Sequence, residues 1–556
     1  MIMGRQGGGV ILGLSLAGLA IVVGLPVLFV ALQAIFPHLS ESSFREPFAN
    51  FGHVLTDERL PELFMNTLML GLLVSCGCFL FALPLAVVRG MTNLPWGGLW
   101  DLLFLIPFMV PPYIGAFAWV LTLQPNGYST QLFGFNLGGF LFSLAGIVTV
   151  MTLHLFPVVY FALSRTLGVI GRRFADVGRV AGASPLYAFW RITLPLSLPG
   201  LAASLLLVFA LTIEEYGTPS ALGRRSQFLV LVTSIEEKFA EWPIDLPGAA
   251  ILSFGLVILA LAAFLLQHWL VTRRSYIAVS GKHGQTALID LGRWRWPAVA
   301  FFAFAAFLAV IVPVGAVILT AFSQTLSGGL TWSNMGLRHF QAVFANRSGA
   351  LDALWNSLWL AGAAAIGAGL LGSLAAYVTV RSQIRGRGLV DALSILPNAL
   401  PGMVIAVGLI LAWNRTWWPF PVYNTAAVLL LAYICLLLPY PVRYVGAGLR
   451  QVGASLDAAA RVSGAGTART LWKILLPLIA PNLMVAMLLV FAIASRELVA
   501  SIMLAPSGMR TVATFVFNQF AQGSPGLGMA LSVLAIFSST AILVALSALY
   551  RKKIET

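Results

Sequence analysis

Twelve segments of this 556-residue chain are each long and apolar enough to cross a lipid bilayer as a helix. The hydrocarbon core of a bilayer needs about 20 apolar residues in a helix. The chain is 59% hydrophobic and only 9% charged, whereas a soluble domain has roughly 25% charged residues. We therefore expect an all-α polytopic membrane protein, with spans at 10–36, 66–88, 100–124, 138–163, 197–218, 248–271, 296–322, 356–380, 389–413, 424–446, 479–504 and 528–550.

The distribution of basic residues predicts the orientation of these spans. With both termini in the cytoplasm, 23 of the 33 Lys and Arg residues lie on the cytoplasmic side, nine lie outside, and Arg496 falls within a span. Short cytoplasmic loops carry an excess of Lys and Arg. The net charge of +14 therefore reflects topology and not a nucleic-acid partner. The run 10–36 exceeds the roughly 7–15 apolar residues of a signal peptide, so we expect a retained first span.

One polar segment in a cytoplasmic loop occurs twice, 282 residues apart. Residues 179–199 and 461–481 both read R-V-x-G-A-x6-W-[RK]-I-x-L-P-L-x-x-P, and 10 of 21 positions are identical. Average composition would give about one or two identities by chance. A duplicated polar island in an apolar chain indicates a duplicated docking surface for a soluble partner.

The repeat extends beyond this loop and divides the chain into two halves. Asn66-Thr67-Leu68 corresponds to Asn356-Ser357-Leu358, and Leu207-Val208-Phe209-Ala210 corresponds to Leu489-Val490-Phe491-Ala492. Six spans in each half give both halves the same orientation, as in parallel repeats. We expect a first half at 1–271, a polar cytoplasmic linker at 272–295 and a second half at 296–556.

Each copy of the loop predicts a helix, a sharp turn and a second helix. Gly182 interrupts a polar helical stretch, since glycine is the usual residue at such a turn. A second short helix then runs to Ile192 and Leu194, and we expect Pro195 to end it before the next span begins. The alternative is an amphipathic loop that rests on the membrane without a partner.

The spacing G-x9-I-x-L-P resembles the EAA loop of permease subunits from binding-protein-dependent ABC importers. In that family the loop holds a coupling helix that sits in a groove of the ATPase subunit. The resemblance implies the type I ABC importer permease fold, with coupling loops at about 172–195 and 454–477. The second copy departs from the family, because the position of its Glu is Ala458, with an acidic residue one position earlier. The implied ATPase-coupling residues are Asp176, Arg179, Gly182, Ile192, Leu194, Pro195, Asp457, Arg461, Gly464, Ile474, Leu476 and Pro477.

The chain has no Walker A sequence, so we expect it not to be an enzyme and to hold no cofactor of its own. No pair of acids or nucleophilic triad predicts a catalytic site. The resemblance implies two ATP-binding subunits on the cytoplasmic face, which bind ATP and Mg. It also implies a periplasmic or lipid-anchored substrate-binding protein on the outer face. The expected location is a bacterial cytoplasmic (inner) membrane, in contact with membrane lipid and without nucleic acid.

Two further stretches are similar to the fused permeases of ferric-iron importers. They are Glu215-Tyr216-Gly217-Thr218-Pro219 and Arg496-Glu497-Leu498 with the residues that follow it to Thr514. The resemblance implies ferric iron as the substrate. Relatives that carry thiamine, phosphonate, polyamine or sulfate share much of the pattern and stay as alternatives. A 12-span secondary transporter is a further alternative, but it gives no reason for the duplicated loop.

Ionisable residues within spans are candidates for the translocation pathway or its gate. These are Glu214, Glu215, Arg496 and Glu497, with Tyr216 beside them. Carboxylate oxygen suits hard cations, so Glu215 and Glu497 could ligate iron transiently. The alternative is an ion pair of Arg496 with Glu214 or Glu215. Glu215 follows the cytoplasmic start of its span by about 24 Å, which places it towards the outer face.

Prolines predict breaks in the third and ninth spans. They are Pro107, Pro111, Pro397 and Pro401, which recur at an offset of 290 residues. Broken helices at membrane depth occur where they line a cavity or are buried in protein. We expect these prolines to lie near the pathway, and the alternative is a kink that serves packing alone.

Overall fold

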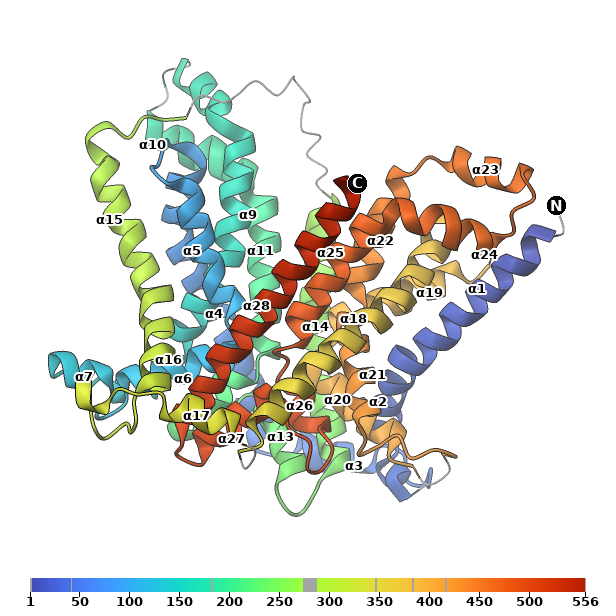
Figure 1. Cartoon of the computed structure of the whole chain (residues 1–556), viewed down its shortest axis with the longest axis horizontal. Helices are drawn as coiled ribbons and strands as arrows, with labels where there is room; N and C mark the ends of the chain where they lie inside the picture. The colour runs from blue at the N-terminus through green and yellow to red at the C-terminus, as the bar shows by residue number, and fades with distance from the viewer. Residues whose placement is uncertain are drawn as a thin grey trace. The chain divides into compact units, whose positions relative to one another are not determined.

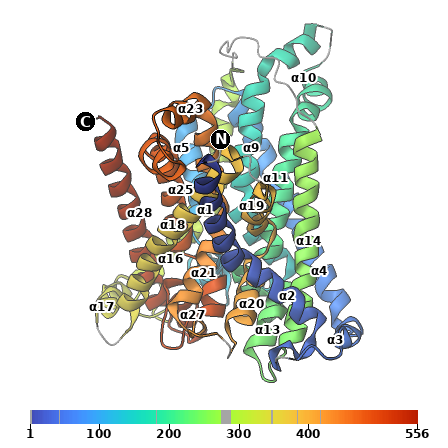
Figure 2. The ribbon, with the colours of Figure 1, turned by 90° about the vertical axis from the view of Figure 1, so that its right-hand side faces the viewer.

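A computed structural model describes residues 3–41, 43–180, 182, 184–273, 288–345, 348–382, 385–415 and 418–555. All named elements in these ranges are helices (Figures 1 and 2), accompanied by two isolated β-bridges. In lipid each backbone polar group must be satisfied within its own segment, and a helix does so. The all-α fold class predicted from composition is therefore confirmed.

The described residues contain nine single helices that could span a membrane. They also contain three pairs of helices bent at a short break, which raise the total to 12 if each pair is one span. The single helices are 9–35, 59–91, 144–168, 189–214, 246–270, 292–322, 350–381, 471–494 and 525–548; the bent pairs cover 97–133, 387–413 and 426–451. Each coincides with one of the twelve predicted segments.

The chain forms two compact units, and each is described by itself. Unit 1 comprises Met1–Asp57, Ile235–Val257 and His339–Thr556. Unit 2 comprises Glu58–Ser234 and Ile258–Arg338. The units thus differ from the predicted sequence halves, which stay a prediction. Residues 274–287 of the predicted linker lie outside the described residues.

Unit 1 combines the first span of the chain with most of the second half. In it α2 packs along α20, and α1 contacts α18 and α19 (Figure 1). At the α2–α20 crossing, a Cβ on Gly408 would overlap the backbone carbonyl of Pro26, so the close approach requires glycine. The principal helices are α1 (Met3–Leu19), α2 (Leu25–Ile35), α18 (Ala350–Arg381), α19 (Arg387–Ile395), α20 (Gly402–Trp413), α21 (Ala426–Leu437), α22 (Pro439–Gln451), α23 (Ala454–Val462), α24 (Thr467–Thr470), α25 (Leu476–Ala494), α26 (Val499–Leu504), α27 (Val512–Ala521) and α28 (Pro525–Glu555).

Unit 2 combines most of the first half of the chain with the first span of the second half. The first span of the second half packs there against the first half, through contacts of α16 with α6 and of α15 with α5. The helices are α4 (Arg59–Met91), α5 (Gly97–Met109), α6 (Pro112–Leu123), α7 (Tyr128–Phe133), α9 (Leu144–Val180), α10 (Pro185–Ala188), α11 (Leu194–Glu214), α15 (Arg295–Ala306) and α16 (Val312–Phe322). Three further helices begin in one unit and end in the other: α13 (Leu231–Ala240), α14 (Leu246–Arg273) and α17 (Arg338–Phe344).

Four prolines inside spans follow five-residue π-turns. The ring of a proline in an α-helix clashes with the carbonyl four residues earlier. In each case that carbonyl lies within the π-turn, whose wider turns carry it away from the ring. The helix therefore continues past the proline. The turns and prolines are η1 (Ala20–Gly24) with Pro26, η3 (Phe189–Thr193) with Pro195, η6 (Phe307–Ile311) with Pro313, and η9 (Leu471–Leu475) with Pro477.

This arrangement corrects one prediction. Pro195 does not end the short helix before the span, because α10, η3 and α11 form one continuous helical run from Pro185 to Glu214. At 1.5 Å per residue this run is about 45 Å long. Its equivalent in unit 1 is α24, η9 and α25, from Thr467 to Ala494, about 42 Å long.

Candidate functional site: two duplicated loops and two carboxylate-capped turns

The two copies of the duplicated loop have the same secondary structure at the 282-residue offset. In each, a helix ends shortly before a glycine, and a four-residue helix, a five-residue π-turn and a long helix follow. Gly182 has φ +86° and Gly464 has φ +77°. Only glycine adopts this left-handed conformation without strain. The sharp turn predicted at both glycines is confirmed.

The side chains of the loop divide into a buried set and an exposed set. In the first copy Thr193 and Leu194 are buried, Ile192 and Pro195 are partly buried, and Trp190 is 52% exposed. Buried residues anchor the short helix, so the exposed ones are available for contact.

The second copy follows the same division. Leu471 and Leu475 are buried, and the side chains of Ile474 and Leu476 are partly buried. Trp472 is 51% exposed, at the position equivalent to Trp190. Pro477 is exposed.

Four predicted coupling residues have described backbones only. Asp176 and Arg179 lie in α9, and Asp457 and Arg461 lie in α23, but their side chains are outside the described part of the structure. Their contacts with a partner stay a prediction.

The helices that lead into the two loops differ. In unit 2, α9 runs without interruption from its span to Val180. In unit 1 the corresponding stretch breaks at Val452 and Gly453, between α22 and α23. The guanidinium of Arg381 donates hydrogen bonds at this break, to the carbonyl oxygens of Leu449 at 2.8 Å and Val452 at 2.5 Å. A cation suits the unpaired carbonyls at the C-terminal end of a helix.

At the end of α11 remote from the loop, Glu215 caps the next helical turn. Its Oε1 accepts a hydrogen bond from the backbone N–H of Gly217 at 2.8 Å, and its Oε2 accepts one from Thr218 at 2.8 Å. The π-turn η4 (Pro219–Gly223) begins directly afterwards. Glu215 thus lies just beyond the helix, at the end predicted to face outwards.

Glu497 performs the same structural role after α25. Its Oε2 accepts hydrogen bonds from the backbone N–H groups of Ala500 at 2.9 Å and Ser501 at 3.3 Å, at the start of α26. Ser501 in turn contacts the hydroxyl of Tyr433 on α21 at 2.7 Å. A carboxylate is stabilised at a helix N-terminus, because unpaired N–H groups point towards it.

A repeated pair of polar contacts holds the chain beyond each capped turn. In unit 2, Asn66 Nδ2 donates to the carbonyl of Leu229 at 3.0 Å, and Thr67 Oγ1 accepts from the N–H of Leu231 at 3.0 Å. These contacts tie the start of α13 to α4. They account for Asn66 and Thr67 in the first copy of the repeat Asn-Thr/Ser-Leu.

Unit 1 contains the equivalent pair. Asn356 Nδ2 donates to the carbonyl of Arg510 at 3.0 Å, and Ser357 Oγ accepts from the N–H of Val512 at 2.8 Å. They tie the start of α27 to α18. The sequence repeat indicated that these positions mattered, but not that they fix the segment after each carboxylate.

The remaining pathway candidates are distributed over the two units. Glu214 is the last residue of α11, and Tyr216 is almost fully buried next to Glu215. Arg496 lies between α25 and α26. Arg496 and Glu497 belong to unit 1, whereas the other three belong to unit 2. The ion pair and the joint ligation of iron therefore stay predictions. No group of three or more His, Cys, Asp or Glu residues suited to a metal occurs among the described residues.

The predicted breaks at the prolines are confirmed. α5 and α6 meet at 95°, with Pro111 at the N-cap of α6. α19 with the following 3-10 turn η8 (Leu396–Ala399) meets α20 at 117°, with Pro401 at the N-cap of α20. Pro107 and Pro397 are buried just before each break.

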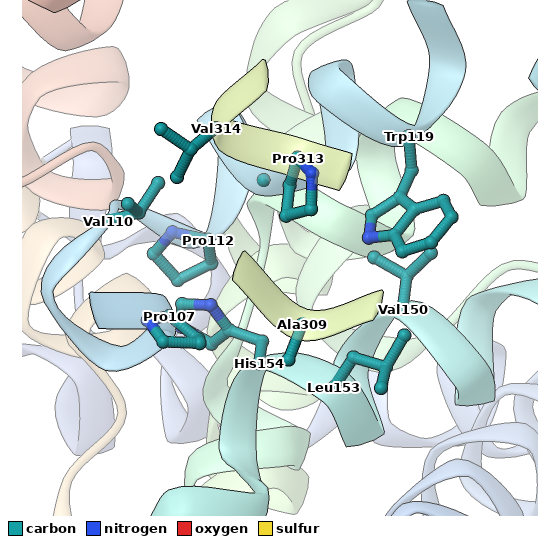
Figure 3. A pocket seen from close by; sticks show the side chains of 11 residues that line it. Pro107, Val110, Pro112, Trp119, Val150, Leu153, His154, Ala309, Pro313 and Val314 are labelled. Atoms are coloured by element: carbon teal, nitrogen blue, oxygen red, sulfur yellow. The ribbon is translucent and has the colours of Figure 1, made fainter. Parts of the chain in front are cut away.

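The break between α5 and α6 borders a pocket within unit 2. About 390 Å³ of unfilled space, including its open mouth, lies between this break, α9 and α16. Pro107, His154 and Pro313 contribute to its wall, and Figure 3 shows their side chains around it. The break thus borders an open pocket, and its place on the pathway stays a prediction.

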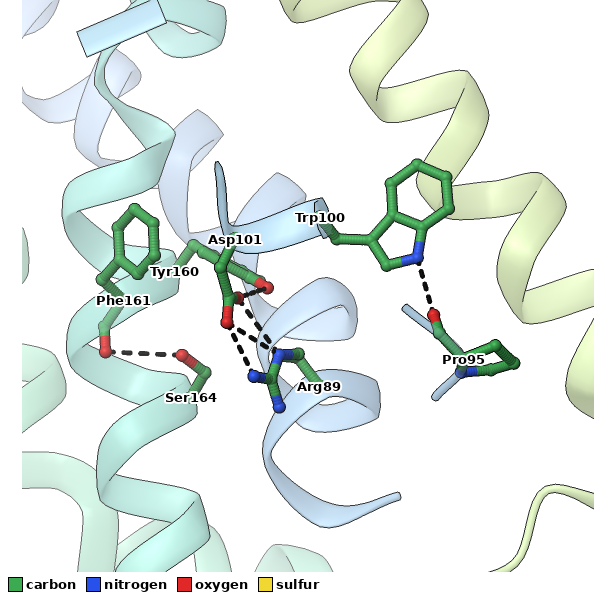
Figure 4. Close-up of polar contacts among 7 residues, drawn as sticks. All are labelled: Arg89, Pro95, Trp100, Asp101, Tyr160, Phe161 and Ser164. Atoms are coloured by element: carbon green, nitrogen blue, oxygen red, sulfur yellow. Dashed lines mark hydrogen bonds and ion pairs between the residues drawn. The ribbon is translucent and has the colours of Figure 1, made fainter. Parts of the chain in front are cut away.

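One partly buried polar network was not predicted from the sequence. Arg89 on α4 forms an ion pair with Asp101 on α5 at 2.6 Å, and the hydroxyl of Tyr160 on α9 donates to Asp101 at 2.7 Å (Figure 4). It joins three helices at one end of unit 2. Opposite charges at the ends of two successive predicted spans could have indicated it.

Comparison with known proteins agrees with this geometry. The family described as "Binding-protein-dependent transport system inner membrane component" matches twice, at residues 80–276 and 368–554. Each match contains one duplicated loop and one capped turn.

Three relatives illustrate the range of similarity. A ferric transport system permease protein of Actinobacillus pleuropneumoniae is 28% identical over 79% of this chain and 64% of its own length. An Fe(3+)-transport system permease protein of Haemophilus influenzae is 24% identical over 91% of this chain and 94% of its own. A putative 2-aminoethylphosphonate transport system permease protein of Salmonella typhimurium is 28% identical over 44% of this chain and 87% of its own. The chain thus spans less than two thirds of the first relative.

Two matches of the family cover more than half of the chain, and both contain the loop that the sequence analysis identified. The chain belongs to the binding-protein-dependent transport system inner membrane components, and it contains the domain of this family twice.

Proposed function

We propose that the chain is the membrane-spanning subunit of an ATP-driven importer that moves ferric iron into the cytoplasm. The observation that supports this proposal is the secondary structure that the two loops share, each followed by one helical run that ends at or shortly before a carboxylate-capped turn. Relatives named for ferric iron align over most of the chain. Two ATP-binding subunits dock on the loops, and a substrate-binding protein docks on the opposite face.

The continuous helical runs suggest how ATP drives transport. From Pro185 to Glu214 the backbone is helical throughout, so a displacement of the loop moves the far end of the same rod. That end is the capped turn at Glu215. Closure of the two ATPases brings the loops together and changes the spacing of the turns; hydrolysis reverses the change. The cytoplasmic position of both termini is part of the proposal, and it rests on the basic loops.

The substrate is tested with the complete transporter in proteoliposomes. The chain is reconstituted with its ATP-binding subunits and binding protein, and uptake of ferric iron is compared with that of 2-aminoethylphosphonate and sulfate. We expect ATP-dependent uptake of iron alone. Uptake of another solute in its place would refute iron as substrate. Uptake that persists without ATP and stops when the proton gradient is collapsed would refute the whole mechanism.

A further inference from the structure

The start of α15 carries an exposed cluster of two arginines and two tryptophans. The sequence Arg293-Trp294-Arg295-Trp296 leads into the first span of the second half. All four residues are exposed, including Trp294 at 62% and Trp296 at 65%. Each guanidinium lies over the indole that follows it, at 6.0 Å for Arg293 and 5.9 Å for Arg295. No carboxylate among the described residues lies within ion-pair distance of either guanidinium.

A clasp of hydrogen bonds fixes this cluster on unit 2. The backbones of Thr92 and Ile289 form a parallel β-bridge across almost 200 residues of sequence. The side chain of Asn93 donates to Asp290 Oδ1 at 2.8 Å and accepts from the N–H of Leu291 at 3.0 Å. These contacts hold the segment before the cluster on the loop between α4 and α5.

A third exposed tryptophan lies in the loop on which the clasp holds the cluster. Trp96 lies in the same loop as Asn93 and is 59% exposed. A hydrogen bond from Trp100 Nε1 to the carbonyl of Pro95 at 3.0 Å shapes that loop (Figure 4). Trp100 also packs edge-on against Phe302 of α15, with ring centroids 5.8 Å apart. The cluster is thus held in place before any partner binds.

Exposed tryptophans beside arginines are typical of one environment, the headgroup region of a membrane. Indole rings collect at the level of the lipid headgroups, where one part of the ring is in apolar and one in polar surroundings. Guanidinium groups at that level bind phosphate oxygens in two-pronged fashion. Asp290 carries the opposite charge: its Oδ1 accepts hydrogen bonds from Asn93 and from the N–H of Gly292, and these bonds together with the charge of Arg295 lower its pKa. One carboxylate beside two guanidinium groups leaves the cluster with a net positive charge.

We propose that Arg293, Arg295 and the tryptophans Trp96, Trp294 and Trp296 form a binding surface for the headgroup of an anionic phospholipid. The bound lipid fixes the end of α15, which packs with α16 against the broken helices α5 and α6. None of these five residues is among those predicted for the substrate route or for ATPase coupling.

The test measures lipid binding to the purified full chain by native mass spectrometry in mixed micelles. Phosphatidylglycerol is titrated against phosphatidylcholine, for the wild type and for the double variant Arg293→Gln with Arg295→Gln. The matched control is Arg45→Gln with Arg338→Gln, which removes two exposed charges elsewhere. Thermal unfolding of both variants checks that the chain is still folded.

We expect the wild type to prefer phosphatidylglycerol and the cluster variant to bind it about 30-fold more weakly at low salt, about fivefold for each arginine. The control should bind like the wild type, and salt near 1 M should reduce the preference. Equal binding of the two lipids by the wild type would overturn the proposal. So would an equal loss in both double variants, or competition by inorganic phosphate at concentrations equal to that of the lipid.

Discussion

Gly464 allows the coupling role of the duplicated loop to be separated from its folding role. Its φ of +77° is unfavourable for any residue with a Cβ, and the cost is roughly 1–2 kcal/mol. A Cβ placed there has no described atom within 4 Å apart from those of the two neighbouring residues. Gly464→Ala and Gly464→Arg should therefore destabilise the isolated chain by the same amount. If the loop inserts into a groove of the ATPase, only the arginine adds a steric clash.

The assay compares thermal unfolding of the purified chain with co-purification of the ATP-binding subunits. We expect similar melting temperatures for the two Gly464 variants and a loss of the ATPase that is at least tenfold greater for Gly464→Arg. Gly523→Arg is the control, because Gly523 has the same φ of +77° and equally open surroundings, but lies between α27 and α28. Equal loss of the ATPase from the alanine and arginine variants of Gly464 would refute contact as the cause. The same series at Gly182 tests the first copy.

Three further changes test the other elements. Glu215→Gln replaces a charged acceptor of two hydrogen bonds. The melting temperature of this variant should fall by the equivalent of about 1–3 kcal/mol. Glu214→Gln is the control, because Glu214 does not cap this turn, and it should lower the melting temperature less. Gly408→Ala places a methyl group against the carbonyl of Pro26; overpacking of about 1–3 kcal/mol should loosen the first span, and limited proteolysis of that span should become faster. Arg381→Gln removes the cation at the break before α23; ATP hydrolysis should become less dependent on substrate-binding protein, and unchanged coupling would contradict a role for this break.

The span positions could be predicted from the sequence because hydrophobic length alone determines them. The path of the helix around Pro195 could not be predicted. A proline in a sequence indicates a stop, and only the backbone shows that a π-turn before it removes the clash. The partner of each span could not be predicted either, since nothing in the apolar surface of α2 specifies α20 as the helix against which it packs.

The carboxylates show the same limit at the level of the site. Their repetition identified Glu215 and Glu497 as a related pair, and an ionisable residue in a span predicts function. Their hydrogen bonds depend on where the preceding helices end, at Glu214 for α11 and at Ala494 for α25. Apolar patterning does not resolve a helix end to that degree. The capping role therefore emerges only from the structure.

The two loops have equal lengths but unequal supports, and this difference bears on how force passes through the chain. The first loop is flanked by α9, which is helical up to Val180, and by α11, which continues the helices α10 and η3 of the loop itself. A displacement of this loop therefore acts on both helices directly. A displacement of the second loop acts on α25 directly, but it acts on α22 only through the non-helical residues Val452 and Gly453. Helical segments transmit displacement along their axis, whereas a non-helical joint absorbs it by rotation about φ and ψ. If one ATPase docks on each loop as proposed, we expect equal displacements of the two loops to move the spans of the two units by unequal amounts.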